Sequence, residues 1–196
     1  MKKITVLLIL SIVICAGLLS GCTSQQQLTV NKGNQTAPPQ SPTQNSTTPP
    51  SSPASSSVNV GDTINGKYLQ VTVLSAQFVN SFNETSGGYK FTVNADEGKT
   101  FLIIKVLLHQ IGDDSQLVSP TDFWVIDNKN TKYDYDYRTY SLNDSLSTTT
   151  LYKNLNTEGR ILYQVPKIAT GLKVQYNFAT FWDSPVIAEW SITTPQ

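Results

Sequence analysis

The stretch that decides the fold is KTFLIIKVLLHQ, residues 99–110. Successive side chains of a strand point to opposite faces. One face is entirely aliphatic: Leu102, Ile104, Val106 and Leu108. The other face is mixed: Phe101, Ile103, Lys105, Leu107 and His109. This pattern predicts a central strand that is covered on one face and partly covered on the other.

Other parts of the chain alternate with the same two-residue period. They are YLQVTVLSAQFV (68–79), GRILYQVP (159–166), LKVQYNFAT (172–180) and VIAEWSI (186–192). In the first of them the phase slips so that Phe78 and Val79 are both apolar, which predicts a β-bulge. A short strand DFWVID (122–127) precedes the turn-rich NKNTK. The pattern predicts an all-β sandwich, with one helical turn at Pro120.

The N-terminus has the features of an export signal. Lys2 and Lys3 precede an apolar run, 4–19, that is short for a membrane span. The run ends in LLSGC, which resembles the lipobox of prokaryotic lipoproteins. That resemblance implies cleavage between Gly21 and Cys22, a diacylglyceryl group on Cys22, and a location on the extracytoplasmic side of the cell membrane. An ordinary signal peptide or an uncleaved anchor remains the alternative to this lipoprotein signal peptide, 1–21.

A low-complexity segment follows the lipobox. Residues 23–57 hold six of the ten prolines, no aromatic residue and one charge, Lys32. Such a segment buries too little apolar surface to fold, so 22–57 is predicted to be a disordered stalk that begins with the lipidated cysteine. All 19 aromatic residues come after Val58. The remaining residues, 58–196, are predicted to form one domain.

Four pieces of the chain, in this order, carry a resemblance to a known family: VGDTI, GKTFLIIKVLL, FWVIDNKNTKYDYD and GRILYQVPK. The chain resembles the immunoglobulin-like (telokin-like) extracellular domains of bacterial and archaeal lipoproteins, a family catalogued as a domain of unknown function. The resemblance implies an immunoglobulin-like two-sheet antiparallel sandwich without established catalytic residues. The chain departs from the family at HQIGDD, where Gln110 stands near a common Asn, and in the loop SFNETSGGY (81–89).

The residue inventory argues against an enzyme or a cofactor protein. Only Cys22 would remain after signal cleavage, because Cys15 lies within the signal, so neither a disulfide nor a thiolate metal site can form. His109 is the single histidine and is expected to be a strand-end side chain. The net charge is zero and only Arg138 and Arg160 are arginines, so nucleic acid is not expected as a partner. The loop carboxylates Asp113 and Asp114 are expected to be solvated turn formers.

The most unusual stretch is KYDYDYRTY, residues 132–140. On a strand, Tyr133, Tyr135 and Tyr137 share one face and the two intervening aspartates, Asp134 and Asp136, share the other. The tyrosines, with Trp182 nearby, are a candidate binding face for a glycan or partner. The aspartates are a candidate pair of Ca²⁺ ligands. The alternative is an ordinary strand with half-buried tyrosines and solvated aspartates.

Two functional hypotheses follow from these features. The first is a non-enzymatic, membrane-tethered lipoprotein whose domain contacts an envelope protein or polymer. The second is a small-ligand, glycan or Ca²⁺ binding module that uses the Tyr133–Tyr137 face. Four sequons are candidate glycosylation sites, at Asn34, Asn45, Asn83 and Asn143.

Overall fold

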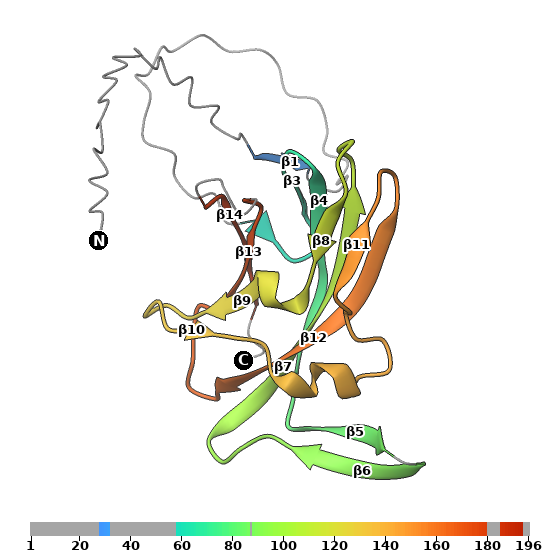
Figure 1. The fold of residues 1–196 in the computed structure, drawn as a ribbon. Helices are drawn as coiled ribbons and strands as arrows, with labels where there is room; N and C mark the ends of the chain where they lie inside the picture. The colour runs from blue at the N-terminus through green and yellow to red at the C-terminus, as the bar shows by residue number, and fades with distance from the viewer. Residues whose placement is uncertain (1–27, 32–57, 87, 180–184, 194–196) are drawn as a thin grey trace, which may run out of the picture.

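The computed structural model describes residues 28–31, 58–86, 88–179 and 185–193, and most of their ordered structure lies in two five-stranded sheets. Sheet A has the order β1-β3-β4-β7-β12, with β1 at Thr29–Asn31, β3 at Thr63–Asn65, β4 at Leu69–Val79, β7 at Lys99–Gln110 and β12 at Asn156–Pro166. Sheet B has the order β10-β9-β13-β14-β2, with β10 at Lys132–Tyr133, β9 at Phe123–Ile126, β13 at Lys173–Asn177, β14 at Ile187–Ser191 and β2 at Val58–Asn59. The sheets face one another (Figure 1). The predicted all-β, immunoglobulin-like sandwich is confirmed.

Strand pairing in the two sheets is antiparallel with one exception. β2 pairs with β14 in parallel, and Trp190 lies opposite Val58. This pair departs from the fully antiparallel sandwich that was predicted. It joins the first and last strands of sheet B in chain order at one edge of that sheet.

The central strand β7 has the two unequal faces that its sequence predicts. Its aliphatic face is fully buried in the main core between the sheets, and consists of Leu102, Ile104, Val106 and Leu108. Phe101 and Ile103 on the other face belong to a second cluster with Leu142 and Leu162. Fully burying one such aliphatic side chain contributes roughly 1.5–3 kcal/mol. β7 is therefore covered on both faces along part of its length.

The predicted bulge is present in β4. Val73 lies opposite Val106, and Ser75 lies opposite Lys105, so Leu74 is the extra residue. Leu74 is exposed. The bulge shifts the phase of the strand, so that Phe78 packs against the main core and Val79 packs against the second cluster.

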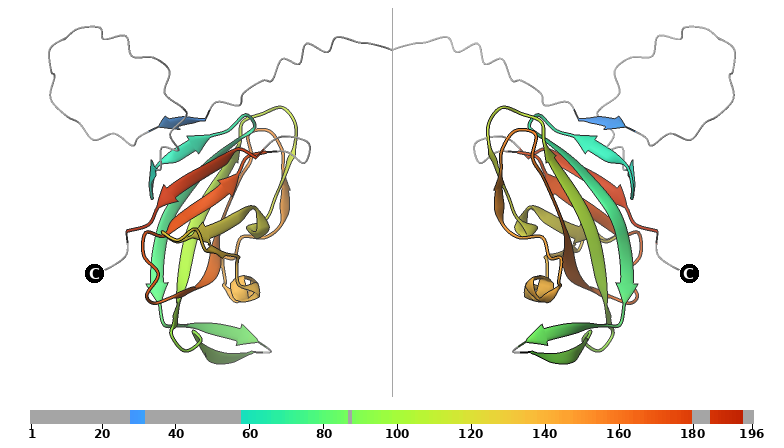
Figure 2. Two further views of the ribbon diagram at one scale, coloured as in Figure 1. Left: turned by 90° about the vertical axis from the view of Figure 1, so that its left-hand side faces the viewer. Right: turned by 90° about the vertical axis from the view of Figure 1, so that its right-hand side faces the viewer.

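The segment predicted as the loop SFNETSGGY instead begins a β-hairpin. β5 (Ser81–Ser86) pairs with β6 (Tyr89–Asn94), and Gly88 in the turn has φ 85°, a value that glycine adopts readily. The hairpin extends from the end of the sandwich opposite to β1 (Figures 1 and 2).

Two short 3₁₀ helices and a two-stranded ladder complete the fold. The ladder pairs β8 (Gln116–Val118) with β11 (Thr149–Leu151). The predicted helical turn is η1 (Pro120–Asp122), where Ser119 and Asp122 form a capping box. The second helix, η2 (Tyr137–Ser141), lies over the outer face of sheet A, where Leu142 completes the second cluster.

Three residues of the predicted stalk form a strand. Thr29–Asn31 form the edge strand β1 of sheet A. Most of the stalk, the signal peptide, Gly21 and Cys22, and the sequons Asn34 and Asn45 lie outside the described residues. Within the described ranges, no helix has the length and hydropathy needed to span a bilayer.

Candidate functional site

The tyrosine-rich segment does not form the predicted strand. Only Lys132–Tyr133 are in β10, and Tyr135 makes a single bridge to Tyr163. Asp136 then caps η2, because its side chain accepts a hydrogen bond from the backbone N–H of Arg138. The expectation that Tyr133, Tyr135 and Tyr137 share one strand face is therefore wrong.

Tyr133 is tied to the turn after β9. Its hydroxyl donates to Asp127 Oδ2 at 2.9 Å, while the backbone N–H groups of Lys129 and Thr131 each donate to Oδ1 at 2.8 Å. Burial acts to raise the pKa of Asp127, but these hydrogen bonds outweigh it and lower the pKa below its usual value. The hydroxyl of Tyr133 is thus used within the fold.

Tyr135 and Tyr137 have different surroundings. Tyr135 is partly buried against the main core, and its ring meets Tyr140 edge to face at a centroid distance of 6.2 Å. Tyr137 is 77% exposed. Of the three predicted tyrosines, Tyr137 presents its ring most fully to a partner.

The two aspartates of the segment are both paired with cations. Arg138 donates from Nε to Asp136 Oδ1 at 2.8 Å and from Nη2 to Oδ2 at 2.5 Å, in a bidentate pair that is mostly buried. Asp134 forms an exposed ion pair with Lys132 at 2.8 Å. Among the described residues no group of three or more His, Cys, Asp or Glu side chains is close enough to hold a metal ion. The arrangement gives the predicted Ca²⁺ pair no geometric support.

Exposed aromatic rings gather at the hairpin end of the sandwich. Phe91 and Tyr89 share one face of β6 with Val93 and are 52% and 73% exposed. The inner part of the same face, Phe82 and Val93, packs against the second cluster. We call the exposed set Tyr89, Phe91 and Tyr137 the aromatic surface.

Stacked side chains connect the hairpin to η2 beneath the aromatic surface. Phe82 meets Phe101 edge to face at 5.3 Å. The guanidinium of Arg138 lies 5.1 Å from the Phe101 ring centroid and 5.6 Å from that of Tyr137. In both views of Figure 2, η2 lies above the hairpin and on the same side of the molecule. The pair with Asp136 thus holds Arg138 in place as the link between the hairpin and Tyr137.

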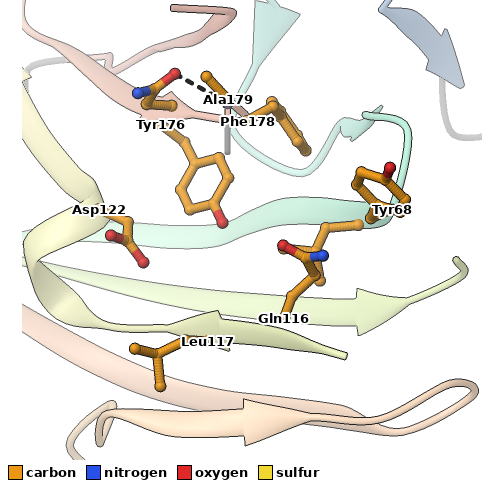
Figure 3. A pocket seen from close by; sticks show the side chains of 9 residues that line it. Tyr68, Gln116, Leu117, Asp122, Tyr176, Phe178 and Ala179 are labelled. Carbon is orange, nitrogen blue, oxygen red and sulfur yellow. Dashed lines mark hydrogen bonds between the residues drawn. The ribbon is translucent and has the colours of Figure 1, made fainter. Parts of the chain in front are cut away.

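A small polar pocket lies at the other end of the sandwich, next to η1 (Figure 3). Its volume is about 70 Å³, and the hydroxyl of Tyr176 points into it between Asp122 and Gln116. Burial raises the pKa of Asp122, and burial together with the nearby Asp122 charge raises the pKa of Tyr176. Asp122 also accepts a hydrogen bond from the Ser119 backbone at 2.8 Å, so it has a structural role in capping η1.

A second hollow, of about 180 Å³, lies beside Phe78, Pro166 and Leu172. Pockets for small molecules have volumes of about 300–1,000 Å³. Both of these hollows are smaller, so neither offers a typical small-ligand site.

The other predicted residues have the following places. Trp182 lies outside the described residues. His109 is the penultimate residue of β7, and it lies between Gln70 of β4 and Asn156 of β12. Asp113 forms an exposed ion pair with Lys153, and Asn83 and Asn143 are both exposed. Asn83 accepts a hydrogen bond from Thr92 at 3.2 Å.

Gln110, where a departure from the family pattern was expected, is fully buried. Its Nε2 donates to the carbonyl oxygens of Gly112 and Asp114. Gln110 therefore fixes the backbone of the loop that follows β7.

The residues of the aromatic surface that sequence reasoning missed are Tyr89 and Phe91. A signal for them was available, because SFNETS and YKFTVN flank a Gly-Gly pair, which is a hairpin pattern. In that register Phe82, Phe91 and Tyr89 fall on one face.

Solved structures of other proteins have a similar fold. The yjhA protein from Bacillus subtilis has a similar structure, with a TM-score of 0.54 and 19% identity, over 68% of this chain and 98% of that one. A conserved hypothetical protein from Bacillus anthracis has a TM-score of 0.50 and 13% identity, over 69% and 95%. An uncharacterized β-sandwich protein from Clostridium difficile 630 has a TM-score of 0.44 and 12% identity, over 74% and 99%. The first two likenesses concern the fold alone.

No curated protein matches the chain. A family described as a domain of unknown function, DUF4352, matches residues 58–187, which include every strand of the two sheets except β1 and all but the first residue of β14. The match covers more than half of the chain, and the chain belongs to the DUF4352 family.

Proposed function

We propose that the chain is a lipid-anchored, non-catalytic binding module on the extracytoplasmic side of a cell membrane, and that its aromatic surface binds an envelope protein or polymer. The observation that carries this proposal is the exposure of Tyr89, Phe91 and Tyr137, on a hairpin and a helix that the contacts of Phe101 and Arg138 join. Large exposed apolar side chains that lie together often mark interaction sites. Aromatic residues are also the type enriched in protein interfaces.

The membrane anchor rests on the start of the chain. LLSGC combines small residues with a cysteine where a signal peptide should end, and Cys22 is the only cysteine that would remain after cleavage. Two acyl chains bind a membrane far more firmly than one, because each buried methylene adds about 0.8 kcal/mol.

A macromolecular partner fits the surface better than a small ligand does. The rings of the aromatic surface extend outward from a hairpin and a helix, whereas small ligands need a concave site that encloses them. The two described hollows lie elsewhere, and both are small.

A non-catalytic role is proposed because the described carboxylates near the aromatic surface and the small polar pocket have structural partners. Asp127 and Asp136 organise turns, and Asp122 caps η1. The alternative of a glycan or Ca²⁺ site on Tyr133–Tyr137 is the less favoured proposal. Tyr133 and Tyr135 pack inward and Asp136 is bound by Arg138.

The proposal can be tested by photocrosslinking in intact cells. A photoreactive phenylalanine analogue replaces Tyr89 or Tyr137, and, as the matched control, Tyr152. Tyr152 is 62% exposed but is not part of the aromatic surface. We expect one dominant adduct from positions 89 and 137 and none from position 152. Mass spectrometry of the adduct identifies the partner as a protein or a glycan polymer.

A second variant, Y89S/F91S, should abolish the adduct formed from position 137. Equal labelling from position 152, or an unchanged adduct in Y89S/F91S, would contradict the proposed surface. Substrate turnover by the purified full chain that a single point mutation abolishes would contradict the non-catalytic role.

A further inference from the structure

The strand β1 is a short addition to the edge of sheet A. Val30 lies opposite Ile64, and the Asn65 side-chain Nδ2 donates to Thr29 Oγ1 at 3.3 Å. All three residues of β1 are exposed, and the preceding Leu28 packs partly against the main core. The strand is thus held mainly by its pairing with β3.

Because β1 lies close to Cys22 in the chain, its pairing with β3 shortens the segment between Cys22 and the folded domain. Thr29 comes seven residues after Cys22, whereas Val58, where the continuous domain begins, comes 36 residues after it. A fully extended chain spans at most 3.3–3.6 Å per residue, so seven residues reach about 25 Å and 36 residues reach about 120 Å. For flexible coils the typical spans are about 15 Å and 33 Å.

The two ends of the sandwich also differ in what they carry. β1 and β3 lie at one end, and the β5–β6 hairpin with Tyr89 and Phe91 lies at the other (Figures 1 and 2). A tether that enters through β1 therefore brings the β1 end toward the membrane. The aromatic surface is then directed away from the bilayer.

We infer that pairing of Thr29–Asn31 with β3 shortens the membrane tether and orients the domain with its aromatic surface outward. This inference rests on the proposed lipid anchor at Cys22. β1 has exposed backbone and few buried contacts, which are the features of a segment that opens locally at low cost. Its release lengthens the tether and frees the orientation of the domain.

Paired cysteines test whether β1 is docked, independently of any membrane. Thr29 and Asn65 are directly opposite, at a separation that a disulfide can bridge. We expect T29C/N65C to form an intramolecular disulfide under mild oxidation in the purified full chain. The control T29C/T92C places the second cysteine on β6 at the far end, and it should form none.

Energy transfer then measures height and orientation. The lipidated chain is reconstituted in phosphatidylglycerol–phosphatidylethanolamine vesicles that carry a headgroup acceptor dye. A fluorescent amino acid at Asn59 reports on the β1 end, because a short turn joins β2 to β3, and one at Thr92 reports on the hairpin. The states compared are the wild type, oxidised T29C/N65C, and T29P/V30P/N31P, which lacks the N–H donors of β1.

We expect transfer from position 59 to exceed transfer from position 92 in the wild type, and the disulfide to preserve or increase this difference. In the proline variant transfer from position 59 should fall by about twofold, and the two positions should become similar. Equal transfer in the wild type and the proline variant, or a disulfide yield no higher than in T29C/T92C, would overturn the inference. Failure of the lipid anchor itself is separately visible, because the chain would not float with the vesicles.

Discussion

The indole Nε1 of Trp190 donates a 2.9 Å hydrogen bond to the backbone carbonyl oxygen of Asp62, across 128 residues of sequence. Trp190 is fully buried in β14 of sheet B, and Asp62 lies in the turn that leads into β3 of sheet A. One side chain therefore joins the two sheets at their edge.

Replacing Trp190 with phenylalanine should lower the free energy of unfolding by about 2–4 kcal/mol. The change leaves the Asp62 carbonyl without its donor and removes part of the buried ring. Urea unfolding followed by far-UV circular dichroism measures the loss. The matched control is W124F, at a half-buried position, which should cost less. A W190F protein as stable as the wild type would show that this hydrogen bond contributes nothing to the free energy of unfolding.

Asp136→Asn should destabilise the protein by about 1–3 kcal/mol at neutral pH, because it leaves Arg138 unpaired in a mostly buried site. Burial acts to raise the pKa of Asp136, but hydrogen bonds and the charge of Arg138 outweigh it and hold the pKa below 3.8. A lowered folded pKa means that this stabilisation is complete above pH 3.8 and is lost as the pH falls through the folded value. The difference between the variant and the wild type should therefore shrink in acid. Unfolding curves at neutral pH and near pH 3 test this, and a constant difference would contradict it.

Gly159→Ala should destabilise the protein strongly, by about 2–3 kcal/mol or more. A Cβ at this position would lie 2.5 Å from the backbone N and Cα of Leu146, which cannot move aside as a flexible side chain can. The control is Glu158→Ala, the neighbouring residue. It removes only an exposed pair with Lys105, and such pairs are worth about 0–1 kcal/mol. Similar melting temperatures for the two variants would refute the packing argument.

Deletion of Leu74 should leave the domain folded. The deletion removes the bulge, and the residues on both sides of it keep their partners on β7 and their faces. Deletion of Gln164 in β12 is the control, because β12 pairs with β7 without a bulge that could absorb the loss, so Val165 turns away from the main core. We expect cooperative unfolding for the first deletion and its loss for the second. The opposite order would show that the bulge itself is required.

The double variant Y89S/F91S should change stability by less than about 0.5 kcal/mol, because both side chains are largely exposed. Phe82→Ala, on the same face of the hairpin, should cost about 2 kcal/mol or more because Phe82 packs on Phe101. Thermal unfolding distinguishes the two. If Y89S/F91S unfolded early, the aromatic surface would have a role in stability rather than in binding.

Strand alternation made most of the sandwich predictable from the sequence. In β7 the contrast between Leu102–Leu108 and the mixed opposite face anticipated both the main core and the partial second cluster. The residue types on each face of a strand indicate whether that face is buried, so burial of this kind can be predicted from one segment alone.

The tyrosine segment was not predictable from alternation. The sequence alternates at Tyr133, Asp134 and Tyr135 as a strand does. Asp136 instead accepts hydrogen bonds from the backbone N–H and the side-chain Nε of Arg138, and it caps a helix. The contacts that hold the helix to sheet A come from Leu162, whose carbonyl oxygen accepts from the Asp136 backbone at 2.7 Å. Leu162 lies 26 residues away, and no local pattern reports such a contact. The same is true of β1, whose partner β3 follows it by more than 30 residues.

The parallel pair of β2 with β14 also bears on when the domain can fold. Val58 and Trp190 are separated by 132 residues, so sheet B is complete only when nearly the whole domain is available. Contacts between such distant residues form slowly. A chain exported from its N-terminus would already carry its anchor while β14 was still on the other side of the membrane. On the proposed export route, the domain would therefore cross the membrane unfolded and assemble only after export.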